Sequence, residues 1–156
     1  MLYLGHQYDP AVDQLRKTIE LDPNYFLAHM LLGDSYAQKG HMSEAIPELE
    51  KAVSLGECNQ SLGELGHAYA LSRKRQEAQR MADKLIAEWK GSHVGAYSIA
   101  VIEVGLGQED RALAWLERAY EDRTFFMLDL EREPEFDPLR SNQRFKDLLR
   151  RMNFPS

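Results

Sequence analysis

The sequence predicts an all-α solenoid, in which antiparallel helix pairs stack side by side and a C-terminal capping helix closes the last pair. The string LLGDSYA at 31–37 recurs as ELGHAYA at 64–70, 33 residues later. Alanines continue this period in both directions, at Ala11, Ala45, Ala78 and Ala112. Around them, apolar residues recur at the spacings of three and four that are typical of a helix face. Because each such helix pair has an apolar face that only a neighbouring pair can cover, the period indicates a solenoid.

Length and composition exclude several other classes of protein. The chain has 156 residues, 44% apolar and 28% charged, which is typical of one globular domain and not of a disordered or collagen-like chain. A formal charge of -6, spread over both halves, argues against a nucleic-acid partner. No apolar run approaches the roughly 20 residues that span a bilayer, and the N-terminus lacks the features of a signal peptide. Cys58 is the only cysteine, so no internal disulfide forms, and we expect a cytoplasmic protein without a membrane partner.

The first element is an incomplete repeat at 1–22. Leu2, Tyr3 and Leu4 fall at the end of a helix whose earlier turns are missing, and Asp9-Pro10 begins the second helix. Because the terminal unit of a solenoid normally has a polar outer face, this start indicates a fragment of a longer repeat protein. The alternative is a natural start at which the stub packs against a neighbouring subunit.

Three complete helix pairs follow, at 23–57, 58–91 and 92–122, and a degenerate capping segment occupies 123–156. Glycines stand where helices are expected to end, at Gly40, Gly56, Gly91 and Gly107. In the capping segment, TFFMLDLERE predicts a short helix, PEFDP a turn, and SNQRFKDLLRRM an amphipathic last helix. The basic residues of that helix are expected to be solvated, because cations near a helix C-terminus are favoured without any ligand.

One order of residue types recurs from unit to unit. A bulky residue, Leu-Gly, an aromatic residue, Ala, a bulky residue and Ala are supplied in the second unit by His29, Leu32, Gly33, Tyr36, Ala45, Leu49 and Ala52. The fourth unit has Glu103 where the aromatic residue is expected. This order resembles the tetratricopeptide repeat (TPR) family over about residues 8 to 121, and the tail resembles the closing segment of multidomain bacterial TPR proteins. The resemblance implies a right-handed superhelical solenoid with a concave face lined by the first helix of each unit.

The concave face is the binding site that the resemblance implies. We expect it to be lined by the stripe opposite the packing face of each first helix, namely Leu27, Met30, Asp34, Gln38, Gln60, Gly63, His67, Val94, Tyr97, Val101 and Val104. Family members that bind a peptide's terminal carboxylate use lysine and asparagine on this stripe. The matching places here hold Met30 and Asp34, then Gly63 and His67, so that clamp is absent and the predicted groove is mainly apolar.

The first helix of the fourth unit, expected at about 94–106, is apolar on nearly every side and needs cover on both faces. Three covers are open. The C-terminal segment can fold back with Phe125, Phe126 and Leu128, a partner can supply an amphipathic helix, or a second copy of the chain can dock.

No pattern in the sequence predicts catalysis, a cofactor or a metal site. The histidines fall in different units without the spacing of metal ligands, at His6, His29, His41, His67 and His93. Cys58 has only the acidic Glu57 beside it, which does not favour a reactive thiolate. Glu103 stands at a packing position, where a raised pKa can mark a functional site. We expect it instead to lie at the rim of a shifted register, or to be satisfied by a nearby arginine such as Arg111 or Arg118.

The predicted function is that of a non-catalytic protein–protein interaction module, which binds an apolar or amphipathic peptide or helix in its concave groove. The alternative is a self-associating structural or regulatory arm of a larger bacterial signalling or transcription-regulating protein. The expected partner is therefore a protein or peptide, or a second copy of the chain in a homodimer.

Overall fold

The computed structural model describes residues 8–152, and within that range every regular element is a helix. The elements are α1 (Tyr8–Leu21), α2 (Phe26–Gln38), α3 (Met42–Leu55), α4 (Asn59–Leu71), α5 (Arg75–Ser92), α6 (Ala96–Gly105), α7 (Glu109–Glu121), the 3-10 helices η2 (Phe125–Asp129) and η3 (Pro134–Leu139), and α8 (Gln143–Arg151). The stub predicted at Leu2, Tyr3 and Leu4 lies outside the described residues.

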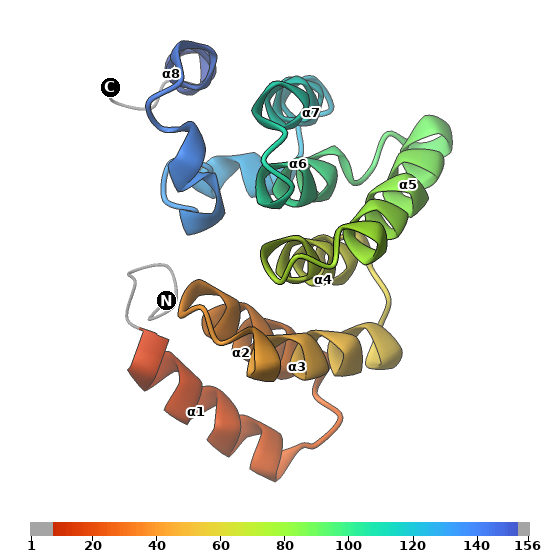
Figure 1. The fold of residues 1–156 in the computed structure, drawn as a ribbon, viewed down its shortest axis with the longest axis vertical. Coiled ribbons are helices and arrows are strands. Elements are labelled where there is room, and N and C mark those ends of the chain that lie inside the picture. Colours follow the sequence, from red (N-terminus) through yellow and green to blue (C-terminus); the bar gives the residue numbers. More distant parts are fainter. Residues whose placement is uncertain (1–7, 153–156) are drawn as a thin grey trace.

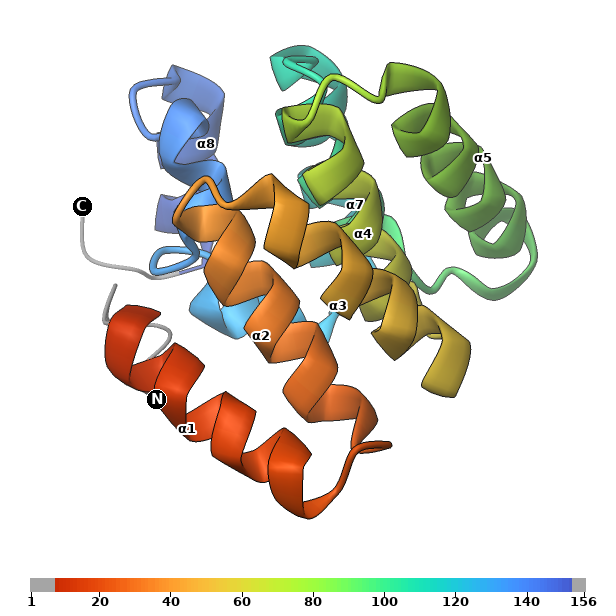
Figure 2. The ribbon, with the colours of Figure 1, turned by 60° about the horizontal axis from the view of Figure 1, so that its bottom comes forward.

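The α-helices are arranged as successive antiparallel pairs (Figure 1). Helix α2 packs mainly on α3, α4 on α5, and α6 on α7, while α1 lies along α2 (Figure 2). Helix α4 also contacts α3 and α6, so each pair is joined to the next one. The predicted fold class is confirmed: the chain is an all-α, right-handed superhelical solenoid of helix pairs.

Small residues allow the paired helices to approach closely. A Cβ atom added to Gly33 on α2 would stand 2.5 Å from Leu49 Cγ and 3.0 Å from the Ala45 carbonyl oxygen on α3. The repeated alanines of the second helices are fully buried, namely Ala45, Ala52, Ala78, Ala82, Ala112 and Ala119. Larger side chains at these places would push the helix axes apart, which explains why the period is carried by glycine and alanine.

The chain after α7 differs in one element from its prediction. The sequence PEFDP, expected to be a turn, lies in the 3-10 helix η3. Pro134 at the start of this helix has its φ fixed in the helical range and needs no amide partner there. Phe136 N then donates to the Glu133 carbonyl at 3.3 Å, which continues the tight winding.

The last helix, α8, packs on α7 through its apolar face. Phe145 and Leu148 are buried, and Asn142 Oδ1 caps the helix by accepting a hydrogen bond from Arg144 N at 3.0 Å. Arg144 also reaches Glu117 of α7, with Nη2 3.3 Å from Oε2. Part of the basic cluster of α8 is therefore neutralised by acidic residues of the same chain.

Candidate functional site

Helices α2, α4 and α6 form the concave face and carry all the predicted groove residues except Val94, which lies in the loop before α6. Leu27 and Val94 are exposed, at 38% and 54%, and Gln38 and Gln60 are half-buried. The other predicted residues are buried, namely Met30, Asp34, Gly63, His67, Tyr97, Val101 and Val104.

The chain's own C-terminal segment, residues 125–139, covers the middle of the concave face. The rings of Phe126 and Phe136 lie 5.7 and 5.5 Å from the ring of Tyr97 on α6. Gln38 Nε2 on α2 donates a hydrogen bond to Glu135 Oε1 at 3.1 Å. The sequence leaves three possible covers open. The cover that the described residues supply is the first of these, the C-terminal segment.

The residues that make this cover are only partly the predicted ones. Phe126 contacts Tyr97, whereas Phe125 and Leu128 remain 73% and 61% exposed. The buried apolar contacts come instead from Met127, Leu130, Phe136 and Leu139, which join the same hydrophobic cluster as α4 to α7. The C-terminal segment is therefore part of the core and not a loose strap.

Hollows remain on either side of the C-terminal segment. On one side is a cavity of about 40 Å³, lined by Met30, Leu31, Asp34, Gln60, Glu64, Tyr97, Val101, Phe126, Glu133 and Glu135. On the other is a more open depression, lined by Gln38, His67, Leu71, Val104, Gly105, Pro134, Glu135, Asp137 and Pro138. A cavity of about 40 Å³ has room for an ion or for a few water molecules.

Two predicted groove residues pack α4 on α6. A Cβ atom added to Gly63 would stand 2.8 Å from Ser98 Cβ, so the two helices touch at this point. His67 lies against Gly105, where an added Cβ atom would stand 2.6 Å from His67 Cδ2. Burial lowers the pKa of His67, while the Glu135 charge acts in the opposite direction. Both residues are buried, and their main contacts are between α4 and α6.

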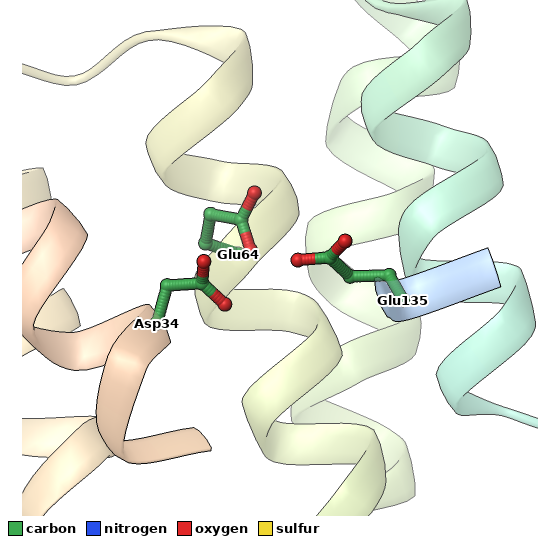
Figure 3. Close-up of side chains that lie close together, drawn as sticks. All are labelled: Asp34, Glu64 and Glu135. Carbon is green, nitrogen blue, oxygen red and sulfur yellow. The ribbon is translucent and has the colours of Figure 1, made fainter. Parts of the chain in front are cut away.

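Three carboxylates meet where α2, α4 and η3 converge, and we call Asp34, Glu64 and Glu135 the carboxylate cluster (Figure 3). One oxygen from each lies within 4.8 Å of those of the other two. Figure 3 shows the three side chains pointing toward one another from three separate elements. Asp34 and Glu135 are only 3% and 5% exposed.

Burial and mutual repulsion perturb the titration of these acids. Burial, with the charges of Glu64 and Glu135 next, raises the pKa of Asp34 well above its ordinary range. The pKa of Glu64 is raised for the same reasons, again with burial first and Glu135 second. Beside them, burial and Glu135 raise the pKa of Glu133 to about 8. Such a group of oxygens can hold shared protons or a hard cation such as Ca²⁺ or Mg²⁺.

Sequence reasoning placed Asp34 on the concave face but missed Glu64, Glu133 and Glu135. A signal was present, since Asp34 is the only Asp, Glu, Lys or Arg in α2, and Glu64 the only one in α4. A single charged residue in an otherwise uncharged inner helix indicates a specific contact. No signal local to the sequence pairs either residue with Glu135, because that contact depends on how the C-terminal segment folds back.

Glu103 is the corresponding single charge in α6, and its predicted partner is confirmed. Arg111 Nη2 on α7 lies 2.7 Å from Glu103 Oε1, while the Glu103 side chain is completely buried. Burial raises the pKa of Glu103, and the arginine charge lowers it. This acid is therefore held by an ion pair away from the carboxylate cluster.

Other reactive side chains have structural contacts. His29 Nδ1 lies 2.6 Å from Glu48 Oε2, and its Nε2 lies 3.0 Å from the Pro23 carbonyl oxygen, so both ring nitrogens are engaged. Cys58 Sγ accepts a hydrogen bond from Ser61 N at 3.5 Å and caps α4. These contacts give His29 and Cys58 structural roles that do not require a catalytic function.

A solenoid of helix pairs with a concave inner face defines this chain as a helical-repeat protein. A family model described as "TPR repeat" matches residues 1–40, and a second, described as "Tetratricopeptide repeat", matches residues 27–55. Over these residues, the chain is similar to the TPR family, as the sequence predicts.

The fold as a whole has a counterpart among solved structures. The structure titled "Crystal structure of MamA" is 22% identical in sequence and superposes with a TM-score of 0.54, over 94% of this chain and 90% of that one. No curated protein sequence matches significantly. Within residues 8–152, no helix is both long and apolar enough to cross a bilayer.

Proposed function

We propose that the chain is a non-catalytic protein-recognition module, which binds an apolar or amphipathic segment of a partner protein at the open edge of its concave face. The observation that carries the proposal is a row of accessible residues at equivalent repeat positions, Leu27, Gln60 and Val94, spaced 33 and 34 residues apart. Phe126, 40% exposed, extends this row from the C-terminal segment. We call these four residues the open row.

Physical arguments favour a short segment over a long one. The C-terminal segment already occupies the middle of the concave face, so the surface beside the open row is a narrow edge. Because the inner helices are packed in advance, binding there has little ordering cost on the side of the repeat protein. An amphipathic helix or extended segment with a few apolar anchors matches such a narrow surface.

The proposal is tested by pulldown with the double variant Leu27→Glu, Val94→Glu. Both residues are exposed, so the substitutions are expected to leave the fold intact and to abolish capture of the partner. The matched control is Leu21→Glu, which changes a leucine of α1 that is 89% exposed and does not belong to the open row. Equal capture by the double variant and the control would contradict binding at this edge.

A second candidate function, self-association, is supported by a different surface. Phe125 and Leu128 of η2 are strongly exposed and lie beside a hollow that Tyr120, Met127 and Met152 also line. If two copies of the chain pair through this surface, sedimentation velocity will give a dimer that Phe125→Glu, Leu128→Glu converts to a monomer. A wild-type monomer over a wide range of concentration would rule this function out.

A further inference from the structure

The more open of the two hollows beside the C-terminal segment lies where the inner helices end. Gln38, Leu71 and Gly105 line it, and they are the last residues of α2, α4 and α6. We call it the His67 hollow, after the histidine of α4 that also lines it. The open row lies at the other ends of the same helices, about 16 Å away along α2 at 1.5 Å per residue, so the hollow is a separate surface.

His67 is a buried polar side chain without a hydrogen-bonding partner among residues 8–152. It is 4% exposed, and no described residue makes a hydrogen bond with either ring nitrogen. Buried polar groups in proteins are nearly always paired, so a group from outside the described residues is expected to reach this imidazole. The ring lies beside Gly105 and lines the hollow, from which such a group has access to it.

The other walls of the hollow are mainly apolar. Leu71, which is 46% exposed, lines it together with Val104, Pro134 and Pro138. The volume of about 280 Å³ is close to the lower end of the range for small-molecule pockets, roughly 300 Å³, which is the scale of one large side chain. An aromatic ring with a polar tip would pack on these walls and bring the tip to His67.

The charges around the hollow disfavour an anion. Burial lowers the pKa of His67, so the imidazole is neutral at neutral pH and has one nitrogen that donates and one that accepts a hydrogen bond. The charged residues among the described lining are the acids Glu135 and Asp137. The C-terminal ends of three helices add partial negative charge. A phosphate or a carboxylate would therefore be repelled.

A cation is not favoured either, because both acids already have partners. Glu135 Oε1 accepts a hydrogen bond from Gln38 Nε2 at 3.1 Å. Asp137 Oδ1 forms an ion pair with Arg140 Nε at 2.6 Å. An ammonium group would lose its hydration in the hollow with little left to compensate it. The best match is an uncharged hydrogen-bonding group on an apolar body.

We propose that the His67 hollow binds one tyrosine side chain of a partner protein. The ring packs on Leu71 and Val104, and the phenol hydroxyl forms a hydrogen bond with the imidazole of His67. A hydroxyl donates and accepts, so it pairs with either tautomer of the imidazole, whereas the indole of tryptophan only donates. The inference does not rest on the function proposed for the open row, because the two surfaces lie at opposite ends of the inner helices.

The test titrates the isotope-labelled full chain with N-acetyl-tyrosinamide and follows the amide chemical shifts by NMR. We expect saturable shifts at Leu71 and Gly105, with a dissociation constant on the order of 1 mM, since a single side chain offers little binding surface. N-acetyl-phenylalaninamide, which lacks the hydroxyl, is expected to bind roughly three- to tenfold more weakly. The phosphorylated tyrosine amide is expected not to bind.

Variants locate the site. Leu71→Glu changes an exposed residue, so it is expected to fold and to weaken tyrosine binding by about tenfold or more, because it places a charge on an apolar wall. His67→Phe keeps a flat ring and is expected to remove the preference for tyrosine over phenylalanine. The matched control is Leu27→Glu in the open row, which is expected to bind as the wild type does. The comparison of the two amides on the wild type needs no variant to fold.

Several results would overturn the proposal. Absence of saturable shifts at Leu71 and Gly105 is one, and tyrosine binding that Leu71→Glu leaves unchanged is another. Equal or tighter binding of the phenylalanine, tryptophan or lysine amide would refute the assignment to tyrosine. If the tyrosine amide bound to Tyr3→Ala and not to the wild type, the occupant would be the chain's own Tyr3 and not a partner.

Discussion

Replacing Phe136 by alanine is expected to destabilise the whole repeat array and not only its tail. The Phe136 side chain is fully buried, 5.5 Å from the ring of Tyr97 and 6.4 Å from that of Phe145, measured between centroids. Truncating a buried phenylalanine costs about 3 to 5 kcal/mol, because transfer energy is lost and a cavity remains. For a chain of this size, that corresponds to a fall of roughly 6 to 20 °C in melting temperature.

Urea denaturation followed by circular dichroism measures this effect. The matched control is Phe125→Ala, in the same segment but 73% exposed, for which we expect a change of about 0.5 kcal/mol or less. Both variants should retain a single transition. If Phe136→Ala lost under about 1 kcal/mol, or unfolded in two separate steps, the C-terminal segment would be an appendage, and its assignment to the core would be refuted.

Two further predictions concern pH and close packing. Stability is expected to fall as pH rises from about 4.5 to 8. The pKa values of Asp34 and Glu64 are raised and that of Glu133 is raised to about 8, so the folded chain binds more protons over this window than the unfolded chain. Urea midpoints that rise over the same window would contradict this sign. Gly63→Ala is expected to cost about 1 to 3 kcal/mol by forcing α4 from α6. Gly91→Ala, in open space on α5, should stabilise by about 0.5 to 1 kcal/mol, and thermal melts that rank the two variants the other way would refute the packing argument.

The helix pairs could be predicted from the sequence because their determinants are local and repeated. The alanines that carry the period are buried, and Gly33 meets Leu49 at the crossing of α2 and α3, as a period of small residues indicates. The arginine partner of Glu103 was also predictable, since Arg111 lies on the next helix of the same repeat.

The carboxylate cluster could not be predicted, because its members meet only through the folding back of the C-terminal segment. Periodicity says nothing about a 3-10 helix of six residues, and PEFDP has the composition of a turn. Asp34 was expected to contact a ligand in an apolar groove, which stays a prediction, whereas the structure places it beside Glu64 and Glu135. The contact is difficult to predict because its members lie far apart in the sequence, and not because of their residue types.

The hydrogen bond between Gln38 and Glu135 joins residues 97 positions apart in the chain. In an open array, each repeat contacts only its neighbours, and folding can spread from any unit to the next. Here the helix pair α2–α3 contacts a segment that is synthesised only after α7. Since domains fold progressively from the N-terminus during translation, the inner helices form while Met30, Tyr97 and Val101 still lack their cover. The nascent chain is therefore most exposed to aggregation after α7 is made and before residues 125–139 have emerged to close the face.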